Sequence, residues 1–336
     1  MSSVEFQQRA ASDQQPEDDP VLLGAAPDRS LELEALGLPI TIETNDERVA
    51  RVARQSFGPR VSDVGPEFAV TLRLLVHDVP EEPGWTPMQP VLRGQGDYFY
   101  LAASRASVVS GDCRTGFAYG FISDRQADHE EHLRSTMIQS PVLWMATQRT
   151  LSAIHCAVVT YNGKTVMLRG RPNAGKTTLA YAALRQGFSL LCEDVAFAFR
   201  HDDGIELRGV PWLLYLKPDA VRFFPELDGL EPLDRYNGEQ KILTFVGERF
   251  PDQVVHRAPL GPAVFVERSQ DGANELIEIG REEALARFEA TRIAMEHRNA
   301  GDVDIWGAML ERPAYRFEVG PDPLAAAAVL REFCES

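Results

Sequence analysis

The sequence predicts a mixed α/β protein whose main sheet combines parallel and antiparallel strands. Two β-rich runs, at 157–161 and 165–169, flank Asn162-Gly163. This dipeptide predicts a hairpin, because a type I′ turn needs two positive φ angles in succession. A glycine-rich turn and a helical stretch at 176–186 follow. The strand that enters this turn therefore has an antiparallel neighbour, which predicts a mixed sheet.

The chain of 336 residues has the length of about two domains. We expect an acidic disordered tail at 1–30, an N-terminal α+β domain at 31–150 and a larger α/β domain at 151–336. The start of the chain carries too few apolar residues to offset the entropy lost on ordering.

Composition excludes several classes of protein. The net charge of −16 argues against a protein that coats nucleic acid, since phosphate binding needs a basic surface. Apolar runs are too short for a membrane span, and no signal peptide is apparent. The four cysteines lack CxxC spacing, which is typical of free thiols in a reducing compartment. We expect a cytoplasmic protein.

In the first half, Asn45 is the expected N-cap of a helix that begins with two acidic residues. A second helical stretch is expected at 124–149, interrupted near Pro141. The expected strands lie at 39–44, 68–76, 98–103, 106–110 and 115–122.

In the second half, strands are expected at 188–192, 195–199 and 205–210. Gly187 ends the helix at 176–186 as its C′ residue. Asp322 is the expected cap of a last helix, with Pro323 at its first position.

Residues 170–177, GRPNAGKT, match the phosphate-binding loop GxxxxGK[ST] without a mismatch. Glycines let the backbone approach a polyphosphate, and successive N–H groups then point at its oxygens. Lys176 adds a point charge, Thr177 offers a hydroxyl to Mg²⁺, and the helix directs its positive end at the anion. The expected nucleotide-binding residues are Gly170, Arg171, Pro172, Asn173, Ala174, Gly175, Lys176, Thr177 and Thr178.

An acidic pair, Glu193-Asp194, follows the strand expected at 188–192. One carboxylate beside a nucleotide can hold Mg²⁺, and the other can accept a proton from an attacking hydroxyl. Neighbouring residues of a strand point to opposite faces, so both can serve one site only if the chain bends there.

Residues 155–194 resemble the catalytic domain of HPr kinase/phosphorylase, a bacterial protein-serine kinase, and more distantly PEP carboxykinase. His155, the loop 170–177, Gly187 and the acidic pair carry the resemblance. It implies a PEP-carboxykinase-like P-loop domain preceded by a smaller α+β domain, with ATP and Mg²⁺ bound. The parent family forms hexamers, and a homo-oligomer stays open here.

The resemblance also implies catalytic roles for Lys176, His155, Glu193 and Asp194. By position, Glu193 is the base and Asp194 binds the metal with Thr177. The chain departs from the family in two respects. The family has two aspartates at the acidic pair, and it has a serine in the middle of the loop where this chain has residues 171–173.

Other candidates are weaker. Lys241, Arg249, Arg257 and Arg171 could stabilise charge on a transferring phosphoryl group. His129 and His132 share a helix face and could hold a metal ion, but no third ligand is evident and a solvated face is the simpler interpretation. The apolar run 212–215 is expected to be core rather than an adenine pocket.

The first interpretation is an ATP- and Mg²⁺-dependent kinase that acts on a serine-type hydroxyl of a peptide, a protein or a small metabolite. A nucleotide-binding regulator or scaffold without catalysis is the alternative. A phosphorylase that works in reverse also stays open. A decarboxylase like PEP carboxykinase is disfavoured, because no arginine cluster for its substrate is evident.

Overall fold

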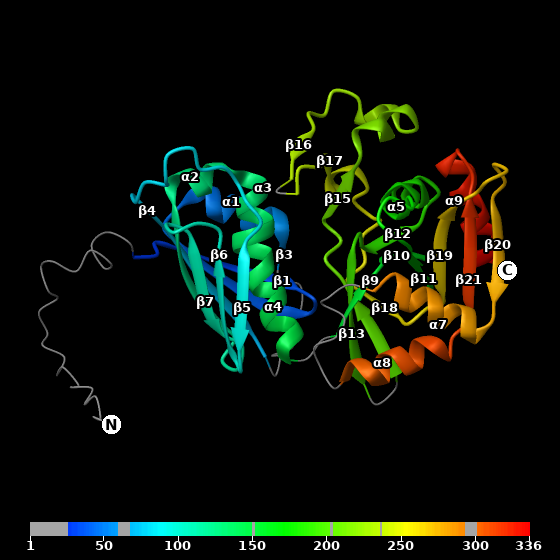
Figure 1. Cartoon of the computed structure of the whole chain (residues 1–336), viewed down its shortest axis with the longest axis horizontal. Coiled ribbons are helices and arrows are strands. Elements are labelled where there is room, and N and C mark those ends of the chain that lie inside the picture. Colours follow the sequence, from blue (N-terminus) through cyan, green and yellow to red (C-terminus); the bar gives the residue numbers. More distant parts are fainter. Residues whose placement is uncertain (1–25, 60–67, 150–151, 202–203, 236, 293–300) are drawn as a thin grey trace, which may run out of the picture.

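The computed structural model forms a mixed α/β fold with several sheets. It describes residues 26–59, 68–149, 152–201, 204–235, 237–292 and 301–336. Figure 1 shows two bodies side by side, which we call the N-terminal body (26–149) and the C-terminal body (152–336). Most of the expected tail, and the expected boundary at residue 150, lie outside the described residues, so the domain limits stay a prediction.

A curved mixed sheet builds the N-terminal body. Within the described residues its order is β3-β1-β2-β4-β8-β7-β6-β5, and β2, β4 and β8 run parallel. The strands are β1 (Arg29–Ala35), β2 (Leu38–Thr44), β3 (Gly58–Pro59), β4 (Val70–His77), β5 (Val91–Gln95), β6 (Tyr98–Ala102), β7 (Val108–Asp112) and β8 (Phe117–Ser123). The five strands expected in this half are confirmed, whereas β1, β3 and β5 were missed.

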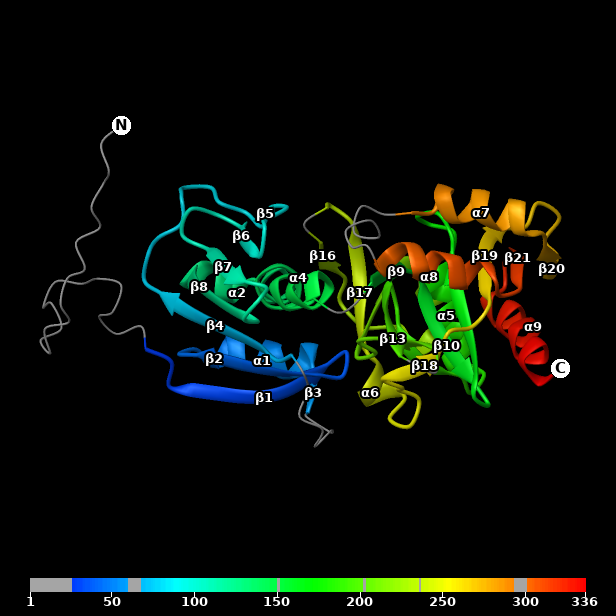
Figure 2. The same ribbon diagram turned by 90° about the horizontal axis from the view of Figure 1, so that it is seen from below.

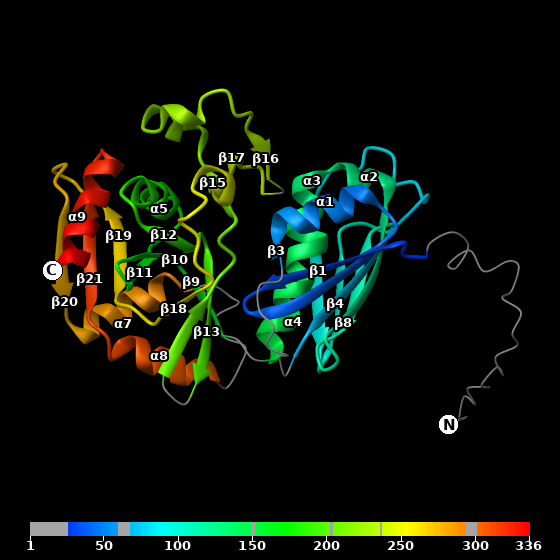
Figure 3. The ribbon, with the colours of Figure 1, turned by 180° about the vertical axis from the view of Figure 1, so that it is seen from behind.

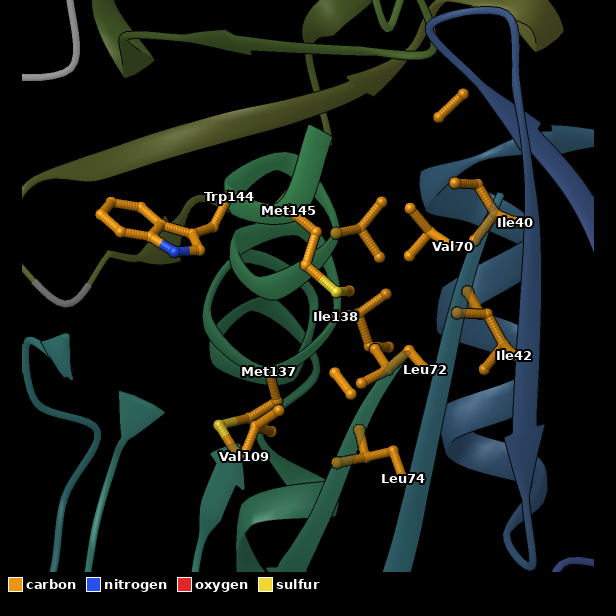
Figure 4. Close-up of a cluster of buried hydrophobic side chains, with 14 of the residues drawn as sticks. Ile40, Ile42, Val70, Leu72, Leu74, Val109, Met137, Ile138, Trp144 and Met145 are labelled. Carbon is orange, nitrogen blue, oxygen red and sulfur yellow. The ribbon is translucent and has the colours of Figure 1, made fainter. Parts of the chain in front are cut away.

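The sheet curls around a long irregular helix, so that β1, β2 and β4 lie on one side of α4 and β5 and β6 on the other (Figure 2). This helix consists of α2 (Asp124–Asp128), α3 (Glu130–His132), the π-helix η1 (Leu133–Gln139) and α4 (Ser140–Arg149). Met137, Ile138 and Met145 point from it into the core formed with the strands (Figure 4).

One local prediction for this body is wrong. Asp46, not Asn45, caps α1 (Glu47–Ser56), because the Asp46 side chain accepts from the N–H of Arg48. The Asn45 side chain instead donates to the carbonyl of Val76 on β4 and accepts from its N–H. The expected interruption of the second helical stretch near Pro141 is confirmed, because the π-helix η1 ends two residues before this proline.

In the C-terminal body, a six-stranded sheet has the order β12-β10-β11-β19-β21-β20 within the described residues. The predicted hairpin joins β10 (Ala157–Tyr161) to β11 (Lys164–Arg169). Asn162 and Gly163 have φ angles of 49° and 76°, both positive as a type I′ turn requires. The other strands are β12 (Ser189–Cys192), β19 (Ala263–Arg268), β20 (Glu275–Ile279) and β21 (Ala314–Val319).

Alternation along these strands separates two cores. Val159 and Leu168 pack toward α5 (Lys176–Arg185) and α9 (Pro323–Glu335). Val158 and Met167 pack on the opposite face, toward α7 (Arg281–Ala290) and α8 (Gly301–Leu310). The helix ends are as predicted: Gly187 has a φ of +88° after α5, and Asp322 accepts from the N–H of Leu324 at the start of α9.

A four-stranded sheet lies beside this one, in the order β18-β14-β13-β9 within the described residues. Its strands are β9 (Ser152–His155), β13 (Val195–His201), β14 (Gly204–Arg208) and β18 (Arg257–Pro259). Phe197 on β13 joins the core of the N-terminal body, and Arg208 donates to the carbonyl of Leu36 there at 3.1 Å. The two bodies are therefore packed against each other.

A third sheet projects above the site described below. We call it the arm: β15 (Leu213–Leu216), β17 (Gln240–Phe245) and β16 (Leu233–Asp234), with the short helices η2 (Pro218–Arg222), η3 (Pro225–Leu227) and α6 (Val246–Arg249). Seen from behind, it reaches from the side of α5 toward α1 and α3 (Figure 3). Leu213 and Leu214 are buried, as expected of the run 212–215, whereas Trp212 and Tyr215 are half-buried.

None of the helices in the described ranges combines the length and the apolar character needed to cross a bilayer. All four cysteines are free and buried.

Candidate functional site

The loop 170–175 connects β11 to α5, so the motif has the strand–loop–helix context that a phosphate-binding loop requires. The structure explains why two positions of the motif are glycine. A Cβ on Gly170 would lie 2.7 Å from the carbonyl oxygen of Val266 on β19. Gly175 precedes the helix with a φ of 102°, which side chains rarely adopt.

Lys176, the first residue of α5, folds back over this loop. Its Nζ donates to the carbonyl oxygen of Gly170 at 2.9 Å, and the residue is only 9% exposed. Burial lowers the pKa of Lys176, while the carboxylates of Asp194 and Glu193 oppose this shift. The loop therefore holds a positive charge at its mouth, beside the acidic pair.

The acidic pair forms the bend between β12 and β13, which belong to different sheets. The chain therefore bends at this point, which is the condition under which two neighbouring carboxylates can belong to one site. The Thr177 hydroxyl donates to Oε1 of Glu193 at 2.7 Å. Burial raises the pKa of Glu193 to about 7, and the charge of Asp194 adds to the shift. The hydrogen bond from Thr177 opposes it.

Asp194 pairs with His155. Nε2 of His155 lies 3.2 Å from Oδ1 of Asp194, and Nδ1 lies 3.3 Å from the carbonyl oxygen of Thr291. Desolvation raises the pKa of Asp194, but the hydrogen bond and charge of His155 outweigh it, so the net shift is downward. The Asp194 side chain is 67% exposed, which leaves it accessible.

A basic cavity of about 290 Å³ adjoins the start of α5. Residues 173–179 form one wall, and aromatic side chains of Tyr215 and Phe223 form part of another. Its cations come from the arm, η2 and β19: Lys217, Lys241, Arg222 and Arg268. In an acidic chain, this local excess of positive charge suits a polyanion.

Not all predicted cations belong to this site. Lys241 lines the cavity, and its charge lowers the pKa of Glu193 against the stronger effect of burial. Arg249 donates to the carbonyl of Glu226, and Arg257 lies 3.9 Å from Glu206 near the other body. Arg171 is exposed and lines a separate cavity of about 630 Å³ between the loop and α7.

The solvated-face interpretation of the histidine pair 129 and 132 is wrong for His132. That ring is buried, with Nδ1 at 3.1 Å from Gln126 and Nε2 at 2.7 Å from the carbonyl of Met88. Among the residues that the structure describes, no group of three or more His, Cys, Asp or Glu side chains could hold a metal ion.

Sequence reasoning missed Arg235 and Arg169, and it assigned Tyr215, as part of the run 212–215, to the core rather than to a pocket. Tyr215 lines the basic cavity, and the charge of Arg235 opposes the rise in the pKa of Glu193 and adds to the fall in the pKa of Asp194. Arg169 is wholly buried, donates to the hydroxyl of Thr291 and stacks over Phe288. Tyr215 and Arg235 follow no recognisable motif, because folding brings them to the loop from distant parts of the chain.

No protein-family model matches the chain, and no curated protein matches it in sequence. In structure, the chain is similar to the Hpr(Ser) kinase/phosphatase from Coxiella burnetii, with 13% identity and a TM-score of 0.34. The match covers 54% of this chain and 89% of that one. A likeness at this level does not indicate the function of this chain.

Proposed function

We propose that the protein is an ATP- and Mg²⁺-dependent kinase that transfers the γ-phosphoryl group to a hydroxyl of a peptide, a protein or a small metabolite. The observation that carries the proposal is the convergence of three groups on one loop. Lys176 is held at the loop mouth, Thr177 contacts one carboxylate, and the second carboxylate is open to solvent.

The residues fit a Mg²⁺–nucleotide. The close approach of Gly170 to β19 and the positive φ of Gly175 favour a loop whose N–H groups cradle phosphates. The basic cavity suits the rest of a polyanion. Mg²⁺ is commonly held by one or two carboxylates and substrate phosphates rather than by an all-protein cage. Bound there, the ion would supply neutralisation of the phosphate charge.

The contacts favour an exchange of the roles that the resemblance implied for the acidic pair. Glu193 is recessed and bonded to Thr177, so these two side chains would hold the metal. Asp194 is exposed and oriented by His155, so it would accept the proton of the acceptor hydroxyl. His155 then acts as a positioning residue, and Lys176 stabilises charge on the phosphates.

A phosphate-transfer assay tests the proposal. Purified protein is incubated with γ-labelled ATP, Mg²⁺, serine peptides and cell extract, beside Lys176→Ala. We expect label to enter a new species with the wild type alone, and mass analysis then identifies the acceptor. Equal transfer by both proteins contradicts the proposal. Nucleotide binding without transfer or hydrolysis by the wild type would instead favour the regulator.

A further inference from the structure

A half-buried polar network joins the arm to the N-terminal body. Nη1 of Arg235, just after β16, donates to Oε1 of Glu131 on α3 at 2.7 Å. The Tyr215 hydroxyl donates to the other oxygen of Glu131 at 3.0 Å. The guanidinium of Arg235 also stacks 4.2 Å above the Tyr215 ring. Three side chains from three elements therefore fix one another.

The N-terminal body sets the position of Glu131. Arg134, one turn further along the helix, is wholly buried and lies 3.6 Å from Oε2 of Glu131. Arg134 is itself held by Glu130 at 2.7 Å and by the side chain of Gln55 at 3.0 Å. The Glu131 side chain is only 12% exposed. Arg235 thus docks against a preformed anchor, which limits the freedom of its guanidinium group.

Arg235 lines one cavity and stacks on a residue that lines another. Tyr215, on which it stacks, lines the basic cavity together with Lys176 and Thr177. Arg235 itself lines a second cavity of about 500 Å³ between the arm and the N-terminal body. Strand pairing sets Leu233, two residues before Arg235, opposite Lys241, which lines the basic cavity.

Electrostatics support this location. Burial is the main cause of the raised pKa of Glu193, and the charge of Arg235 opposes it. The same charge contributes to the lowered pKa of Asp194, although His155 contributes more. The charge of Arg235 therefore acts on both carboxylates of the acidic pair.

We propose that Arg235 is a further catalytic residue, which contacts the phosphoryl group during transfer, and that Glu131 is its positioning residue. This inference rests on the proposed function. In the transfer, a bond forms between the acceptor oxygen and the γ-phosphorus. The bond from that phosphorus to the bridging oxygen of ADP breaks, and the hydroxyl proton passes to Asp194. Arg235 keeps its proton and stabilises charge on the oxygens of the transferring group.

The inference gives the N-terminal body a role in catalysis. Glu131 would hold the arginine only while the two bodies are packed together. A purely structural brace between the bodies is the rival explanation, and it predicts losses of stability or of nucleotide affinity without a selective loss of turnover.

Kinetics of ATP hydrolysis, with Mg²⁺ present and water as the acceptor, separate these explanations. Lys176→Ala is included, because equal rates for it and the wild type would overturn the proposed function and this inference with it. For Arg235→Gln we expect kcat to fall about 100-fold or more, with KM for ATP within about threefold of wild type. Arg235→Lys, which keeps the charge but not the planar fork, should lose about tenfold.

Glu131→Gln should lose about tenfold in kcat, and the double variant with Arg235→Gln should be no worse than Arg235→Gln alone. Arg249→Gln is the matched control, since this arginine bonds a backbone carbonyl away from the acidic pair, and it should stay within about twofold. Thermal unfolding checks that each variant is folded. If Arg235→Gln is not folded, Arg235→Lys decides. The inference is overturned if the folded Arg235 variant has the kcat of the wild type. It is also overturned if the double variant loses kcat by the product of the two single losses. In either case a loss of activity in Lys176→Ala still supports the kinase.

Discussion

The Thr177 hydroxyl donates a hydrogen bond of 2.7 Å to Oε1 of Glu193 and so ties the first turn of α5 to the bend between β12 and β13. The bond joins the phosphate-binding loop to the acidic pair without any ligand between them. It also distinguishes the two carboxylates, because Asp194 is bonded to His155 instead.

Replacing Thr177 by valine removes this donor and the hydroxyl that would bind the metal. We expect turnover to fall about 100-fold, since such preorganised contacts commonly contribute that much, and the Mg²⁺ concentration for half-maximal activity to rise. Thr177→Ser should retain most activity. A titration of activity against Mg²⁺ measures both effects.

Thr165→Val on β11 is a matched control for this change. Within the described residues the Thr165 hydroxyl is buried without a hydrogen-bond partner, so its loss should leave activity and Mg²⁺ dependence unchanged. Equal Mg²⁺ dependence of Thr177→Val and wild type would contradict a metal role for Thr177.

Gly170→Ala should destabilise the protein and weaken nucleotide binding. The added Cβ would lie 2.7 Å from the carbonyl oxygen of Val266, so either the loop or β19 must shift. Overpacking of this kind costs about 1–3 kcal/mol. Gly307→Ala in α8 is the control, because nothing lies within 4 Å of its Cβ and alanine should stabilise the helix by about 0.5–1 kcal/mol. Urea unfolding should therefore give changes of opposite sign, and a neutral Gly170→Ala would refute the packing argument.

His132 should make stability depend on pH. Burial lowers the pKa of His132 below its ordinary value of 6.5, and His129 adds to the shift, against the hydrogen bond to the Met88 carbonyl. Because the folded state favours the neutral ring, this contribution is complete above pH 6.5 and is lost as the pH falls through the folded pKa. The free energy of unfolding, measured from pH 7.5 to 5, should fall less steeply in His132→Gln than in wild type.

His256 provides an additive check on this prediction. Burial lowers its pKa as well, and Arg257 adds to the shift, so its contribution has the same sign. The double variant with His256→Gln should therefore depend on pH still less than His132→Gln alone. Parallel pH profiles for wild type and both variants would show that neither ring is the source.

Local signals predicted the elements around the loop well. Asn162-Gly163, Gly187 and Asp322 occupy the turn, helix end and cap that their own conformational preferences dictate. The predicted cap at Asn45 is wrong because the Asn45 side chain forms a tertiary hydrogen bond with Val76, and the adjacent Asp46 caps the helix instead. Short sequence motifs could not anticipate that competition.

The site was predictable only where it is local in sequence. The loop and the acidic pair lie close together along the chain, and a motif marks the loop. The anchor formed by Glu131, Tyr215 and Arg235 was missed, because each residue alone is an ordinary charged or aromatic side chain. These three residues come together only when the arm packs against the N-terminal body.

The acidic pair allows the sharpest test of the proposed roles. Asp194 is exposed and oriented by His155, so Asp194→Asn should lower turnover about 100-fold or more at saturating Mg²⁺, as expected for loss of a general base, with nucleotide affinity retained. Glu193→Gln should mainly raise the Mg²⁺ requirement, because this carboxylate lies beside Thr177. Steady-state kinetics over a range of Mg²⁺ concentrations separate the two effects. The opposite pattern, with turnover lost in Glu193→Gln and Mg²⁺ dependence shifted in Asp194→Asn, would return the base to Glu193 and the metal to Asp194, as the family resemblance implies.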